Sequence, residues 1–210
     1  MTILPGIFNP LDKVHLGNNV ARELLKQPVS PLDIKESFKG AGIYAIYYFG
    51  DFPEYQPVSR QNANHAYKLP IYLGKAVPSG SRKGGVFKST EPEPKLYDRI
   101  RQHAQSIQAT SNLRLNDFAC RYLLVDDIWI PLAESRLIAH FHPLWNAISG
   151  FGIHAPGKGR KKQKRSDWDT LHPGRAFEKK RPAGRSLAAI KASIQSHIEK
   201  CPIRKDAELE

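Results

Sequence analysis

The sequence predicts an α+β fold whose elements follow in the order strand, strand, helix, strand and helix. Two short apolar runs of β-favouring residues, Gly42–Phe49 and Ile71–Lys75, each lie beside a glycine or a proline. Lys95–Ile107 has residues of one buried stripe at spacings of four, three and four, which is the helical period. Phe118–Val125 then alternates as a strand does, and Pro131 begins a second helix, a position that favours proline.

The first strand is expected at the centre of the sheet. Gly42–Phe49 has no polar alternation, which is typical of a strand covered on both faces. The chain has 210 residues with 40% apolar content, enough for one core of moderate size. We therefore expect a core domain over residues 38–150, after an N-terminal arm and short helix (1–37) and before a basic extension with a C-terminal helix (151–210).

The two ends of the chain have their own patterns. Met1–Asn18 is rich in Gly, Pro and Asn and is expected to form an arm, followed by a short helix over Asn19–Gln27 that Pro28 ends. Ser186–Lys200 is expected to close the chain as a helix capped by Ser186. The apolar stripe expected on that last helix consists of Leu187, Ile190, Ile194 and Ile198.

Two loops are long enough to have a role in binding. Asp51–Leu69 is polar, contains Pro53 and Pro57, and is long for a hairpin connection. It is expected either to contact a ligand or to be a disordered insertion. Pro78–Pro94 is basic and glycine-rich, so it is either a segment that lies along a phosphate backbone or a flexible linker.

The charge of the chain favours a polyanionic partner. The formal net charge is +12 and the pI is near 9.7, which indicates nucleic acid or an anionic membrane surface. The basic residues lie among Gly and Pro rather than on an amphipathic helix, and no run of 18 apolar residues exists, so nucleic acid is the better interpretation. Two widely spaced cysteines and no export signal favour the reducing cytoplasm.

Much of the positive charge lies beyond the predicted core. Ala155–Arg185 holds eleven Lys or Arg against three carboxylates, with Trp168 as an apolar anchor. Such a run is usually a solvated tail, but in an already basic chain it indicates DNA contact. The candidate DNA-binding residues are Arg82, Lys83, Lys158, Arg160, Lys161, Lys162, Lys164 and Arg165.

Polar residues on the predicted helices point to an anion site. Arg99 and His103 are four residues apart and project from the same side of their helix. An arginine beside a core needs an anion, although it can also extend to solvent, and a lone histidine there is more often a core residue. Beside a sheet that carries Tyr44 and Tyr72, the two together favour a phosphate site.

Glu134 is the carboxylate of interest on the second helix. Leu137, Ile138 and Phe141 follow it at plus three, plus four and plus seven, so it lies on or near the core-facing side. Burial of an unpaired carboxylate costs several kcal/mol. A cationic side chain or a divalent metal offsets this cost, and the structural alternative is an ion pair with Arg99 or Arg136.

Taken in order, these residues resemble the GIY-YIG nuclease superfamily. The matching segments are Gly42-Ile43-Tyr44, Tyr72-Leu73-Gly74-Lys75, Arg99, His103, Glu134 and Asn146. Further segments resemble its type II restriction endonuclease branch, which cuts short GC-rich palindromes (CCGCGG-like): Gly74–Pro78, Arg99–His103, Thr110–Leu113, Pro143–Asn146 and Lys164–Arg175. Leu73 stands where the superfamily name has Ile, and the interval between the two tyrosines is longer than in most such domains.

The resemblance implies a three-stranded antiparallel sheet flanked by helices and a Mg²⁺-dependent endonuclease, with Mn²⁺ as a substitute metal. Glu134 would bind the metal, Tyr44 would be the general base or would orient water, and Arg99 would bind the scissile phosphate. The other implied catalytic residues are Tyr72, Lys75, His103 and Asn146. Which of Tyr44, Lys75 and His103 accepts the proton stays open. A palindromic target implies double-stranded DNA as partner and a homodimer, with no membrane.

Two alternatives remain from the residues alone. One is a GIY-YIG nuclease of repair or mobile-element type, although such enzymes usually carry separate DNA-binding modules. The other is a basic DNA-binding protein without catalysis, in which Glu134 is structural.

Overall fold

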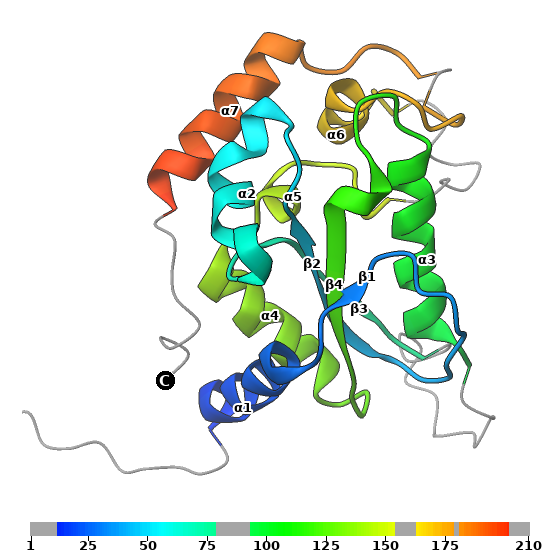
Figure 1. Ribbon diagram of the computed structural model, residues 1–210, viewed down its shortest axis with the longest axis vertical. Helices are drawn as coiled ribbons and strands as arrows, with labels where there is room; N and C mark the ends of the chain where they lie inside the picture. The colour runs from blue at the N-terminus through cyan, green and yellow to red at the C-terminus, as the bar shows by residue number, and fades with distance from the viewer. Residues whose placement is uncertain (1–11, 79–92, 154–162, 179–180, 202–210) are drawn as a thin grey trace, which may run out of the picture.

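A four-stranded antiparallel sheet forms the centre of the molecule (Figure 1). The computed structural model describes residues 12–78, 93–153, 163–178 and 181–201. The strands are β1 (Ser30–Pro31), β2 (Gly42–Tyr48), β3 (Pro70–Ala76) and β4 (Phe118–Leu124), in the spatial order β1-β4-β2-β3. Three strands were expected from the sequence, and the sheet has a fourth, β1. β1 has only two residues, paired with β4 at Ala119 and Cys120, too few to produce a periodic signal.

β2 is the central strand that its sequence predicts, with every residue buried. Its side chains alternate between two cores. Tyr44, Ile46 and Tyr48 join a large aromatic cluster, and Ile43, Ala45 and Tyr47 join a smaller aliphatic one. This pattern explains the continuous apolar run.

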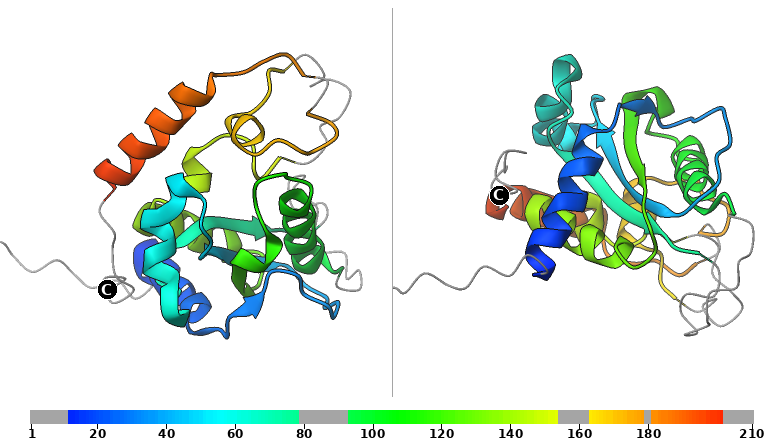
Figure 2. Two further views of the ribbon diagram at one scale, coloured as in Figure 1. Left: turned by 45° about the horizontal axis from the view of Figure 1, so that its top comes forward. Right: turned by 90° about the horizontal axis from the view of Figure 1, so that it is seen from below.

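Helices cover both faces of the sheet (Figures 1 and 2). α3 (Lys95–Gln108) packs on the face with the aromatic cluster through Leu96, Ile100 and Ile107. α1 and α4 pack against each other on the opposite face. Among the described residues after β3, the further helical elements are η4 (Leu115–Asp117), α4 (Ile130–Phe141), α5 (Leu144–Ala147), α6 (Asp167–Leu171) and α7 (Leu187–Lys200).

α1 (Lys13–Lys26) begins six residues earlier than the sequence pattern indicated. The Asp12 side chain accepts a hydrogen bond from the backbone N–H of Val14 at 2.7 Å and caps the helix. Gly17 is a poor helix former but allows close approach to α4, because a Cβ there would lie 2.5 Å from Cγ of Arg136. Contact with α4 therefore makes helical a segment that was expected to be an arm.

The segment between β2 and β3 was expected to be a loop and is partly helical. It contains η1 (Pro53–Tyr55), α2 (Gln56–Asn62) and η2 (Ala63–His65). The Asn62 amide fastens its ends, donating to the carbonyls of Tyr48 and Leu69 at 2.8 and 2.9 Å and accepting from the Leu69 N–H at 2.9 Å. It is not a disordered insertion, because this side chain closes it.

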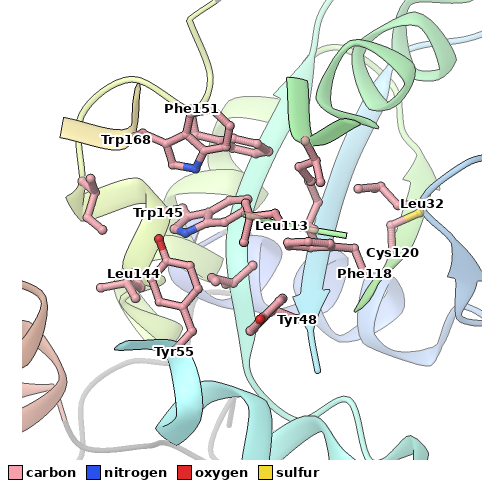
Figure 3. Close-up of a cluster of buried hydrophobic side chains, with 14 of the residues drawn as sticks. Leu32, Tyr48, Tyr55, Leu113, Phe118, Cys120, Leu144, Trp145, Phe151 and Trp168 are labelled. Atoms are coloured by element: carbon pink, nitrogen blue, oxygen red, sulfur yellow. The ribbon is translucent and has the colours of Figure 1, made fainter. Parts of the chain in front are cut away.

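Part of the C-terminal extension belongs to the aromatic cluster. Trp168 on α6 is buried, and Figure 3 shows it beside Phe151 and Trp145. Ser186 caps α7 as expected, accepting from the Ala189 N–H at 3.2 Å. The predicted stripe of α7 is buried at Ile190 and Ile194 but not at Leu187, which is 46% exposed. Leu187 is the first residue of the helix.

Candidate active site

Tyr44 and His103 form a buried pair between β2 and α3. The Tyr44 hydroxyl lies 2.6 Å from Nε2 of His103, and both residues are fully buried. Burial raises the pKa of Tyr44 well above 10, and the neighbouring Tyr72 raises it further, while the Arg99 guanidinium acts in the opposite direction. Tyr44 is therefore a neutral phenol at neutral pH.

Gly74 makes room for the Tyr44 ring. It lies opposite Tyr44 in the β2–β3 register. A Cβ at this position would lie 2.4 Å from the Tyr44 hydroxyl oxygen and 3.0 Å from Cε1 of Tyr72. The glycine of the second motif is needed because two tyrosines approach the backbone of β3 at this point.

Tyr72 completes an aromatic group around His103. Its ring centroid lies 6.2 Å from that of Tyr44 and 5.2 Å from that of His103. Phe151 stacks on His103 at 4.5 Å and meets Tyr72 edge-on at 4.9 Å. Burial raises the pKa of Tyr72, and the Arg99 guanidinium opposes this shift. Four rings from four separate segments therefore fix one another in place.

Arg99 points towards the same place from α3. Its Nη2 donates to the backbone carbonyl of Gly152 at 2.7 Å. A Cβ on Gly152 would lie 2.5 Å from the Tyr72 hydroxyl and 3.5 Å from Nη2 of Arg99. Tyr72, Arg99 and Gly152 thus converge, and the guanidinium, partly exposed and bound to a carbonyl on one side, keeps donors for an anion.

Glu134 pairs with Lys75, not with Arg99 or Arg136 as the structural alternative supposed. The Lys75 ammonium lies 2.6 Å from Oε2 of Glu134, and the two side chains are 36% and 20% exposed. Arg136 binds Oδ1 of Asn18 instead, at 3.0 Å. Glu134 contributes to the raised pKa of both Tyr44 and Tyr72, so its charge acts on the aromatic group.

The donor set around Glu134 suits a cation that keeps its water. In the described part of the chain, no group of three or more His, Cys, Asp or Glu encloses a metal position. Mg²⁺ commonly binds one or two carboxylates and several waters. A partly exposed single carboxylate on α4, paired with Lys75 of the edge strand β3, fits that preference.

Asn146 on α5 holds the backbone of β3 between Tyr72 and Gly74. Its Oδ1 accepts from the Leu73 N–H at 2.9 Å, and its Nδ2 donates to the Leu73 carbonyl at 2.8 Å. The carbonyl oxygen and the NH2 group of the side chain thus each bond to the backbone of the edge strand β3. The structure places Asn146 beside the site, while any direct part in catalysis stays a prediction.

Most of the candidate DNA-binding residues lie outside the described residues: Arg82, Lys83, Lys158, Arg160, Lys161 and Lys162. Lys164 is described and exposed. Arg165 is half-buried, and its Nε donates to the Glu178 carbonyl at 3.4 Å. A DNA-contacting role for these residues therefore stays a prediction.

Sequence reasoning missed the residues that support the site from outside. Phe151 and Gly152 received no role in the sequence analysis, although they contact His103 and Arg99. Asp169 and Arg175 lay within a matching segment but received no role. The only sequence signal for these two residues was that each lies close to an aromatic residue in the chain. Their hydrogen-bond partners are seen only in the folded structure.

These features define a GIY-YIG nuclease domain: a glycine and a tyrosine on each of two paired strands, with Arg, His and Glu from two helices around the tyrosines. The family model described as the Eco29kI GIY-YIG domain matches residues 36–200. The chain therefore belongs to this family of restriction enzyme domains. A search of curated proteins finds no match. Within the described residues, no helix is long and apolar enough to cross a bilayer.

Proposed function

We propose that this protein is a type II restriction endonuclease that hydrolyses phosphodiesters in double-stranded DNA at a specific sequence, with one Mg²⁺ per site. The observation that carries the proposal is the convergence of the Tyr44–His103 pair, Arg99 and Glu134 around Tyr72. Phosphodiester hydrolysis needs an oriented water, a proton acceptor and neutralisation of charge on the phosphate. These groups are suited to supply all three.

Tyr44 and His103 are suited to manage the proton of the attacking water. Since burial keeps Tyr44 neutral, its hydroxyl orients the water rather than attacking as a phenolate. In the tautomer with the proton on Nδ1, Nε2 of His103 accepts the Tyr44 proton across 2.6 Å. Tyr44 then takes the proton of the water as it gives up its own, which is general base catalysis through a relay.

Arg99 and Tyr72 are suited to hold the scissile phosphate. A guanidinium binds phosphate oxygens in a planar bidentate manner. The Gly152 carbonyl fixes one end of the Arg99 fork, which reduces the freedom lost on binding. Tyr72 adds a hydroxyl close to that fork.

Glu134 would hold the metal and Lys75 would orient Glu134. When bound, Mg²⁺ stabilises negative charge on the phosphate and the leaving oxygen. The Lys75 ammonium binds Oε2 of Glu134 and leaves Oε1 available for a further ligand. Mn²⁺, with similar ligand preferences, would substitute.

A homodimer on a CCGCGG-like palindrome is part of the proposal. A twofold site calls for two copies related by a twofold axis, each cutting one strand. The segment Asp51–Leu69 and the basic residues Lys158–Arg165 are the candidates for reading bases. The positive charge of the chain favours the phosphate contacts that any such complex needs.

The test is digestion of a mapped plasmid with Mg²⁺, with Mn²⁺ and with EDTA, followed by sequencing of the ends. The proposal expects defined bands, identical ends at every cut and no cutting in EDTA. Nicks spread over many sequences or confined to branched DNA would instead support a repair-type nuclease. Absence of cutting with any divalent metal would contradict the catalytic proposal and leave DNA binding as the function.

A further inference from the structure

Residues 149–153, which follow α5, touch the candidate active site on one side and α6 on the other. On the inner side, Phe151 stacks on His103 and the Gly152 carbonyl accepts from Arg99. On the outer side, the Ser149 carbonyl accepts from the Trp168 N–H at 3.0 Å. This segment is therefore the connection between the site and the C-terminal extension.

Arg175 donates three hydrogen bonds to that segment and two to Asp169. Nη2 donates to the Gly150 carbonyl at 3.0 Å, and Nη1 donates to the carbonyls of Phe151 and Ile153 at 3.4 and 2.7 Å. Nε and Nη2 also donate to the two carboxylate oxygens of Asp169 at 2.6 Å each. These five bonds use the five N–H groups of a guanidinium. A lysine at this position would lack the planar fork.

Burial makes this arrangement rigid. The side chains of Arg175 and Asp169 are 3% and 2% exposed. The guanidinium lies 4.7 Å above the Trp168 ring and 4.9 Å from the Phe177 ring. The Ser166 hydroxyl binds the Asp169 carboxylate from the other side. Every partner of Arg175 is thus fixed, and the peptide unit that Arg99 contacts lies between two carbonyls that Arg175 holds.

We infer that Arg175, held by Asp169, is a positioning residue for cleavage: it sets the Gly152 carbonyl and, through it, the orientation of the Arg99 guanidinium. This inference rests on the proposed function of Arg99. It assigns to the C-terminal extension a role inside the active site in addition to any contact with DNA. The Lys164–Arg175 segment then serves catalysis through the backbone of residues 150–153.

A double-mutant cycle tests the inference by single-turnover cleavage of the mapped site. Arg175→Lys is expected to lower the cleavage rate roughly 10²-fold, because a displacement near 1 Å can cost that much. In an Arg99→Lys background, the same change is expected to lower the rate less than about threefold, since residues that act as a unit are not additive. Equal reductions in both backgrounds would overturn the inference.

Arg121→Lys is the matched control. Arg121 also donates to backbone carbonyls, those of Gln27 and Tyr67, at 3.1 and 3.3 Å. Its guanidinium lies 5.2 Å over the ring of Tyr47, which belongs to the smaller aliphatic cluster on the opposite face of the sheet. Arg121→Lys is expected to lower thermal stability with the cleavage rate within about threefold of wild type. If Arg121→Lys lost as much cleavage rate as Arg175→Lys, loss of stability alone would explain both effects, and the inference would be overturned.

Asp169→Asn provides the second variant. It retains one acceptor for the Arg175 guanidinium and the same volume, so it keeps the cycle measurable if Arg175→Lys does not fold. The expected pattern is the same, a rate loss in the wild-type background that disappears with Arg99→Lys. Wild-type protein that does not cut DNA would overturn the proposed function itself, whereas active wild type with an additive cycle would overturn only the positioning role.

Discussion

Two buried tyrosine–histidine pairs in this protein share one geometry and differ in their surroundings. Tyr44 meets His103, and Tyr55 meets His172, each with a hydroxyl 2.6 Å from Nε2. Burial raises the pKa of both tyrosines well above 10. The separation of the atoms therefore does not by itself assign a catalytic role to either pair.

The neighbours of each pair make the distinction. Nδ1 of His172 donates to Oδ1 of Asn112 at 2.9 Å, and that amide in turn donates to the Leu171 carbonyl. Burial lowers the pKa of His172 to about 3, so this imidazole stays neutral. It joins η1 and α6 inside the aromatic cluster. This pair is structural because every polar atom is occupied within the core.

The pair at Tyr44 has charged groups within reach. The Arg99 guanidinium and the Glu134 carboxylate both act on the pKa of Tyr44, in opposite directions. Arg99 and the Lys75–Glu134 pair are partly exposed, so a ligand can approach them. The candidate site is therefore distinguished by charged groups at the boundary of the core, and not by the hydrogen bond inside it.

The largest expected difference between the two pairs is in cleavage. Tyr44→Phe is expected to lower the single-turnover rate by about 10² to 10⁴, the range for loss of general acid–base catalysis. Tyr55→Phe is expected to leave the rate within about threefold but to lower the free energy of unfolding by about 1–3 kcal/mol, because Nε2 of His172 loses its partner. Equal cleavage by the two variants would break the comparison.

The next effect is on stability at acid pH. The ordinary pKa of histidine is 6.5, and that of His172 is about 3. The unfolded chain therefore binds more protons between these values, so the free energy of unfolding falls as the pH drops from 6.5 towards 3. The loss from this residue amounts to at most about 5 kcal/mol.

Chemical denaturation at a series of pH values measures this effect. His172→Gln can still bond with Tyr55 and Asn112 but does not titrate, so its stability should fall less steeply than that of wild type over the same range. Parallel curves for the two proteins would show that His172 does not stay neutral.

A smaller effect is expected at Asn146, which sharpens the boundary between site and scaffold. Asn146→Ala removes both hydrogen bonds to the Leu73 backbone. We expect the free energy of unfolding to fall by about 1–3 kcal/mol and the cleavage rate to fall less than about tenfold, since Tyr72 and Gly74 keep their strand neighbours. A rate loss as large as that of Tyr44→Phe would place Asn146 in the chemistry.

Local patterns in the sequence predicted the parts of the fold that depend on neighbours along the chain. The apolar run of β2 and the helical period of α3 correspond to the observed elements. The beginning of α1 was missed because Gly17 and Asn18 disfavour a helix, and contact with Arg136 outweighs that preference. Helix α2 was missed because it depends on Asn62 fastening both ends of its segment.

The candidate site follows the same division. The sequence analysis singled out five candidate residues because each lies on a periodic element or in a recognisable motif: Tyr44, Tyr72, Arg99, His103 and Glu134. The ion pair between Lys75 and Glu134 was not predicted, and neither were the hydrogen bonds from Arg175 to the backbone of residues 150–153. Both join residues that are remote in sequence, and no periodicity encodes such contacts.

The most direct test of the central claim compares two glutamates that each pair with a lysine. Glu134 pairs with Lys75 at 2.6 Å, and Glu54 pairs with Lys191 at 2.5 Å, with glutamate side chains 20% and 16% exposed. The measurement is single-turnover cleavage of the mapped DNA site with Mg²⁺, together with DNA binding, for Glu134→Gln and Glu54→Gln. Glu134→Gln is expected to lose about 10³-fold in rate with binding retained, and Glu54→Gln is expected to cut like wild type. Undiminished cutting by Glu134→Gln would contradict the central claim.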